Sequence, residues 1–174
     1  ADVINRKVDY PAEFGYGLVT NKWLLETFSG TIGLIGADTK MNIIRNLMEA
    51  PQYQDYLGLG EFRDYISLPQ RFACDDIDAT EQMVGEQLKN STSRIFLMGM
   101  GHVKSGLIHR LKKYTDAVFL DVGASIDALA GIIDVNRPFA GDWTNYQIDE
   151  PHLYEGVDFL AYEGQGKHIT LSRE

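Results

Sequence analysis

Four short, continuous apolar runs, separated by stretches of helical periodicity, constrain the fold of this chain more than any other feature. The runs occupy residues 31–36, 64–68, 94–98 and 117–121. A run that is apolar throughout is typical of a strand covered on both faces of a sheet. Strands that alternate with helices indicate βα crossovers. The sequence therefore predicts an α/β fold with a Rossmann-like, mostly parallel sheet flanked by helices on both faces.

Apolar spacing and boundary residues place the expected helices around these strands. One helix follows the first strand and ends before Pro51, because proline cannot continue a helix. The Tyr-, Gly- and Leu-rich segment 52–63 predicts a connection made of turns. Asp78 is the expected N-cap of the next helix. Three further helices are expected, at 21–28, 104–114 and 126–133.

Length and composition indicate one globular α/β domain over residues 1–174, with an irregular or lid-like tail from about residue 137. The net charge of −9 argues against a nucleic-acid-binding surface, which needs basic residues to neutralise phosphates. No apolar run reaches the roughly 18 residues of a membrane span. The single Cys74 cannot form an internal disulfide, so we expect a buried thiol and a reducing, cytoplasmic environment. Because the chain begins with Ala1, it is compatible with a fragment of a longer protein.

The turn after the third strand is the strongest candidate for a ligand-binding loop. It contains Gly99, Gly101, His102, Lys104 and Ser105 and leads directly into a helix. Glycines let the backbone turn sharply, and a helix N-terminus presents free N–H groups to an anion. Lysine and serine in the first turn add a cation and a hydroxyl. The pattern predicts a site for a phosphate-bearing small molecule; the alternative is an ordinary tight βα turn.

A second glycine turn follows the first strand and carries a basic residue at the start of the helix. Asp38 or Thr39 is expected to cap that helix, and Lys40 comes next in the sequence. Two interpretations of Lys40 stay open, a solvated surface side chain or a participant in a binding site.

The turn after the fourth strand combines a carboxylate, a glycine and a hydroxyl. Asp121 ends the strand, and Gly123, Ser125 and Asp127 follow it. This arrangement suits the hydroxyl groups of a ribose or a sugar. Asp127 is the candidate general base, because a base must reach the reacting hydroxyl from the loop side. The alternative is that both carboxylates only cap the helix.

Beyond this turn, Arg137 is a candidate phosphate ligand, because guanidinium groups bind phosphate through two parallel hydrogen bonds. Trp143 could stack on a sugar or base, or could pack under a lid. His109, His152 and His168 show no metal-ligand spacing.

The order of these motifs over roughly residues 31–146 resembles the bacterial GT-D-type glycosyltransferases. The segments that carry the resemblance are TIGLIGADTK, IFLMGMGHVKSGLIHRLKK and AVFLDVGASIDALAG, followed by Arg137-Pro138. The resemblance implies a Rossmann-like sheet that binds a nucleotide-sugar, often a uridine diphosphate (UDP) sugar, with a divalent metal such as Mn²⁺ or Mg²⁺. It also implies donor phosphates near residues 99–105 and a ribose or sugar near Asp121, Gly123, Ser125 and Asp127.

One motif of that family is missing, the Asp-x-Glu metal motif near its N-terminus, which occurs nowhere in this sequence. Its absence implies that the metal ligands lie outside this chain, or that the protein does not perform metal-assisted transfer.

The leading hypothesis is a glycosyltransferase of polysaccharide biosynthesis that moves a sugar from a nucleoside diphosphate donor to a hydroxyl of a glycan or glycoconjugate acceptor. A module that binds a phosphorylated metabolite without catalysis is one alternative. An enzyme that uses NAD or S-adenosylmethionine is the other. The glycine spacing 99-101-106 is longer than that of the dinucleotide fingerprint, and Leu120-Asp121-Val122-Gly123 is similar to a methyltransferase motif.

Overall fold

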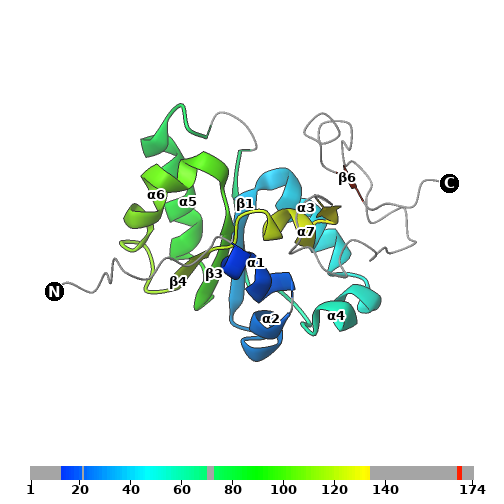
Figure 1. The fold of residues 1–174 in the computed structure, drawn as a ribbon. Helices are drawn as coiled ribbons and strands as arrows, with labels where there is room; N and C mark the ends of the chain where they lie inside the picture. Colours follow the sequence, from blue (N-terminus) through cyan, green and yellow to red (C-terminus); the bar gives the residue numbers. More distant parts are fainter. Residues whose placement is uncertain (1–12, 21, 70–72, 134–167, 170–174) are drawn as a thin grey trace, which may run out of the picture.

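The computed structural model describes residues 13–20, 22–69, 73–133 and 168–169, and these form an α/β structure around one parallel sheet. The strand order is β2-β1-β3-β4, and every neighbouring pair is parallel (Figure 1). The predicted α/β fold with a Rossmann-like sheet is confirmed. The strands are β1 (Ile32–Ala37), β2 (Tyr65–Leu68), β3 (Ile95–Gly99) and β4 (Val118–Asp121).

Helices cover both faces of this sheet, as the apolar strands predict (Figure 1). On one face lie α1 (Glu13–Thr20), α2 (Trp23–Thr27), α3 (Asp38–Leu47), α4 (Pro51–Leu57) and α7 (Ser125–Leu129). The other face packs against α5 (Ile77–Lys89) and α6 (Lys104–Leu111), which follows a single 3₁₀ turn, η1 (Gly101–Val103).

Neighbouring residues of one strand supply two separate cores. Leu34 packs into the cluster under α3 and α7, whereas Ile35 packs into the cluster under α5 and α6, and both are fully buried. Successive side chains of a strand point to opposite faces. A central strand therefore has to be apolar at every position, which explains the continuous runs in the sequence.

Two stacked aromatic rings and a glycine lie side by side on three strands, on the α5/α6 face of the sheet. Gly33, Phe96 and Phe119 are neighbours in register on β1, β3 and β4. The two rings stack with centroids 5.8 Å apart. A Cβ atom at Gly33 would lie 2.4 Å from Phe96 Cε1, so the glycine leaves the space that the ring fills.

The segment after Pro51 is a helix, so the predicted turn-rich connection over 52–63 is wrong in its first half. Pro51 is the first residue of α4, where its missing N–H has no helical partner to lose. Gly58 ends the helix in the left-handed region at φ 65°. Tyr53 is buried and donates its hydroxyl to the Leu129 carbonyl, which ties α4 to α7. The same proline thus ends one helix and starts the next.

Four smaller predictions are also wrong. The N-cap of α3 is Ala37, which has no side-chain cap, and not Asp38 or Thr39. The N-cap of α5 is Asp76, whose carboxylate accepts the N–H of Ala79 at 2.9 Å, and not Asp78. Cys74 is exposed, because it lies in the turn before this cap instead of in the core. The last helix stops at Leu129, and β5 (Ile132–Ile133) pairs antiparallel with β6 (His168–Ile169).

In the part of the chain that the structure describes, no helix has the length and apolar character of a membrane span.

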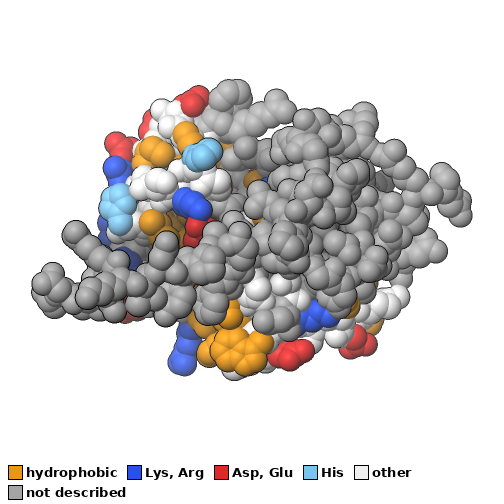
Figure 2. All heavy atoms as spheres, in the orientation of Figure 1, with side chains coloured by type: hydrophobic (Ala, Val, Ile, Leu, Met, Phe, Trp, Pro, Cys, Tyr) orange, Lys and Arg blue, Asp and Glu red, His pale blue; other side chains and the backbone are white. Residues whose placement is uncertain are grey.

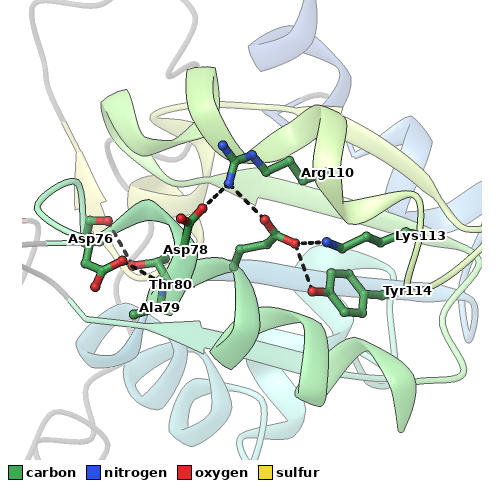
Figure 3. Close-up of polar contacts among 9 residues, drawn as sticks. Asp76, Asp78, Ala79, Thr80, Arg110, Lys113 and Tyr114 are labelled. Atoms are coloured by element: carbon green, nitrogen blue, oxygen red, sulfur yellow. Dashed lines mark hydrogen bonds and ion pairs between the residues drawn. The ribbon is translucent and has the colours of Figure 1, made fainter.

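Helices α5 and α6 are joined by a charged cluster around Glu81 (Figure 3). Its carboxylate pairs with Lys113, accepts Arg110 Nη1 at 3.0 Å and accepts the Tyr114 hydroxyl at 2.9 Å. Gly85 makes this possible, because a Cβ there would lie 2.4 Å from the Tyr114 ring. Hydrogen bonds from Lys113, then Tyr114 and Arg110, lower the pKa of Glu81 from 4.5 to about 2.

This lowered pKa predicts a specific loss of stability in acid. A carboxylate with a lower pKa in the folded state stabilises the fold above its unfolded pKa of 4.5. That contribution falls as the pH drops from 4.5 towards 2. Urea unfolding should show that wild type has a higher free energy of unfolding than Glu81→Gln at pH 6, and that most of this difference is lost at pH 2.5. Glu86→Gln, on the same helix, controls for the loss of one surface charge. If the free energies of unfolding of wild type and Glu81→Gln differed by the same amount at both pH values, the lowered pKa of Glu81 would be contradicted.

Candidate functional site

The carboxyl ends of β1, β3 and β4 meet at one edge of the sheet. The strand order reverses between β1 and β3, because the chain goes from β1 outward to β2 and then returns to β3. In open α/β sheets, ligands bind outside the carboxyl ends of the strands at such a switch point. All of the predicted site residues that the structure describes lie at the ends of β3 and β4, in the turns that follow, or in the first turns of α6 and α7.

The first turn of α7 packs directly against this switch point. Gly36 and Gly99 are partners in register on β1 and β3. A Cβ at Gly99 would lie 2.7 Å from Ile126 Cβ and 2.8 Å from the Gly123 carbonyl oxygen, and one at Gly36 would lie 3.4 Å from Ile126 Cγ2. Packing of α7 by itself explains why residue 99 is glycine. The predicted contact of Gly99 with a ligand stays a prediction.

The turn after Gly99 is open to solvent. Gly101, His102 and Ser105 are exposed, while the buried Met100 and Val103 anchor the turn to the core. Gly101 has φ 57°, and a Cβ built there would meet nothing within 4 Å. No side chain caps η1 or α6 in the described structure. N–H groups at a helix start that no side chain caps can bind an anion.

Lys104, the first residue of α6, forms an ion pair with Asp121, the last residue of β4. The two side chains are 39% and 36% exposed. Asp121 also accepts the N–H of Gly123 at 3.1 Å, which orients the carboxylate at the end of β4. The sequence predicts both residues as ligand-binding, in two separate turns, and the fold brings them together. Figure 2 shows basic, acidic and histidine side chains exposed over α6 and β4.

Lys40 and Asp127 form a second ion pair at the same edge, and this one is nearly buried. The lysine side chain is 13% exposed and the aspartate side chain 9%. The interpretation of Lys40 as a solvated surface residue is therefore wrong. Because both charges are largely out of water, each depends on the other far more than in an exposed pair. The pair joins the first turn of α3 to that of α7.

The structure limits what two predicted residues can do. Ser125 is 1% exposed, so its hydroxyl is not available to a ligand in this conformation. The Asp127 side chain is 9% exposed and paired with Lys40, and its role as general base stays a prediction. Arg137 and Trp143 lie outside the described residues.

Metal binding has no support from the described part of the chain. Within it, no group of three or more His, Cys, Asp or Glu side chains could hold a metal ion. The described residues therefore do not form a site for the divalent metal that the resemblance implies. The sequence already predicted that the ligands of such a metal lie outside this chain.

A hollow of about 550 Å³ lies at the opposite, amino-terminal edge of the sheet. Serine and threonine hydroxyls, Arg94 and Asp116 line it before β3 and β4. Nothing in the sequence singled out these residues. The hollow does not coincide with the predicted ligand loops, and we consider it less informative, because it lacks the helix start and the ion pairs found at the carboxyl edge.

A comparison of this chain with protein-family models, with curated proteins and with solved structures finds no match. The fold and the geometry of the site are therefore the basis for any functional conclusion.

Proposed function

We propose that this chain is a glycosyltransferase, or the nucleotide-sugar-binding portion of one. It would transfer a sugar from a nucleoside diphosphate donor, in our view UDP, to a hydroxyl of a glycan or glycoconjugate acceptor. The observation that carries the proposal is the Lys104–Asp121 pair beside the uncapped turn that starts at Gly101. This arrangement offers a cation, the N–H groups of a helix start without a side-chain cap, and a carboxylate within one exposed surface.

The proposed chemistry assigns a part of the ligand to each group. Lys104 and the N–H groups of the turn bind the diphosphate and stabilise its charge as it leaves. Asp121 accepts hydrogen bonds from hydroxyls of the ribose or the sugar. The acceptor oxygen bonds to the anomeric carbon, and the bond from that carbon to the diphosphate breaks, with the electron pair leaving on the diphosphate. The acceptor proton passes to a carboxylate, for which Asp127 is the candidate once Lys40 moves away.

A module that binds a phosphorylated metabolite without catalysis is the second candidate. The Lys40–Asp127 pair favours it, because the candidate base is engaged with a lysine and nearly buried.

A thermal-shift panel tests the proposal. UDP and UDP-sugars, with and without Mn²⁺, are compared with NAD, S-adenosylmethionine and inorganic phosphate at equal concentration. A ligand at 100 times its Kd stabilises the fold by about 2.7 kcal/mol, which is about 5–10 °C in Tm for a chain of this size. We expect UDP and UDP-sugars to raise Tm in wild type and not in Lys104→Met. Lys89→Met, which removes an equal charge from the end of α5, should respond like wild type.

The other outcomes separate the rival functions. A shift with NAD or S-adenosylmethionine alone would contradict a nucleotide-sugar site. Stabilisation by UDP-sugar without release of UDP, in the presence of glycan acceptors, would favour the binding module.

A further inference from the structure

We infer that Asp121 makes the proposed site select nucleoside diphosphates over bare inorganic diphosphate. The inference rests on the proposed function and adds to it a residue that determines specificity. It follows from the fact that the cation of the site, Lys104, is already paired with a carboxylate of the same chain. Any anion that binds Lys104 has to compete with Asp121.

The pair is exposed enough to be opened by a ligand. Both side chains are more than one-third exposed, and such ion pairs contribute little to stability. A diphosphate carries more negative charge than one carboxylate, so it can take the lysine at small cost. The Lys40–Asp127 pair differs in this respect, because its side chains are nearly buried and an anion cannot reach the lysine from solvent.

Asp121 does not leave the site when Lys104 is taken. Its Oδ1 atom accepts the N–H of Gly123, which lies on the turn between β4 and α7 and is independent of the lysine. The carboxylate therefore stays beside the bound anion. A bare diphosphate then faces a like charge, which weakens its binding.

A nucleoside diphosphate changes this balance because it brings hydroxyl groups. A carboxylate that has lost its lysine can accept hydrogen bonds from the ligand, and hydrogen bonds to an ionised group are stronger than neutral ones. Ribose or sugar hydroxyls can donate to them. Asp121 thus weakens the binding of an anion without hydroxyl groups, and it forms hydrogen bonds with an anion that carries them.

Calorimetric titration of the full chain with UDP and with inorganic pyrophosphate tests this inference. The variants are Asp121→Asn, Lys104→Met and the control Asp116→Asn, which removes one negative charge at the opposite edge of the sheet. We expect Asp121→Asn to bind pyrophosphate about tenfold more tightly and UDP no more tightly than wild type does. The ratio of the two dissociation constants, pyrophosphate to UDP, then falls about tenfold. Asp116→Asn should keep the wild-type ratio, and Lys104→Met should weaken both ligands.

Each other result has a distinct meaning. If both ligands bind wild type and Lys104→Met weakens them, but Asp121→Asn keeps the wild-type ratio or raises it, the inference about Asp121 is wrong and the diphosphate site stands. An equal fall of the ratio in Asp116→Asn would assign the effect to net charge and also overturn it. If wild type binds neither ligand, or Lys104→Met binds both as wild type does, the proposed function fails together with the inference.

Discussion

Replacing Phe96 with alanine should lower the free energy of unfolding by about 3–5 kcal/mol, the cost of removing a buried aromatic ring. Phe96 is fully buried, and its ring fills the space above Gly33 while stacking on Phe119. Phe96 belongs to the core cluster between the sheet and helices α5 and α6, so removing its ring leaves a cavity there. Urea unfolding followed by circular dichroism measures the change.

A control and a double variant make this prediction specific. Phe28→Ala removes the same side chain from a site that is 37% exposed, and should cost about 1 kcal/mol or less. Gly33→Ala should destabilise wild type, because the new methyl group meets the Phe96 ring at 2.4 Å. In the Phe96→Ala background the same change should cost less, since the ring is gone. A cost that is equal in both backgrounds would show that ring and glycine do not interact as described.

Lys40→Met should destabilise the fold by about 3–5 kcal/mol, because it takes away the lysine partner of the nearly buried Asp127 carboxylate. The buried pair joins α3 to α7, and α7 in turn lies against the switch point of the sheet. Denaturant unfolding at neutral pH measures the loss. Replacing both partners, as in Lys40→Met with Asp127→Leu, should recover most of it, since the nearly buried carboxylate is then removed together with its lysine.

The second lysine–aspartate pair provides the matched control. Lys104→Met removes the same charge from a pair whose side chains are 39% and 36% exposed, and it should cost about 1 kcal/mol or less. If Lys40→Met and Lys104→Met lowered the free energy of unfolding equally, burial would not determine how much each ion pair stabilises the fold. That result would contradict the stabilising role of the buried Lys40–Asp127 pair.

The sheet could be predicted from the sequence because its strands have a local signature. A central strand such as β1 is buried on both faces, so Leu34 and Ile35 both have to be apolar, and the run stands out from the amphipathic helices around it. The helix α4 escaped prediction because Pro51 is compatible both with the end of one helix and with the first position of the next. Only the burial of Tyr53 against α7, a contact between distant segments, favours the second possibility.

The candidate site could be predicted only in part. The glycines, Lys104 and Asp121 could be predicted because each lies at the end of a strand or shortly after it, where parallel sheets bind their ligands. The pairing of Lys40 with Asp127 could not be predicted, because it depends on how α7 packs over β1 and β3. The same packing buries Ser125, whose position in the sequence suggested an exposed hydroxyl. Local patterns identify residues at the edge of a sheet, and tertiary packing decides which of them are exposed.

The central claim is that the turns at the carboxyl edge of the sheet bind the diphosphate of a nucleotide. Titration of the ¹⁵N-labelled chain with UDP, followed by amide chemical shifts, tests it most directly. The account predicts the largest shifts at Gly101–Lys104 and at Gly123, and none at residues 91–94 and 115–117 on the opposite edge. Shifts confined to that opposite edge, or no shifts at saturating UDP, would contradict it.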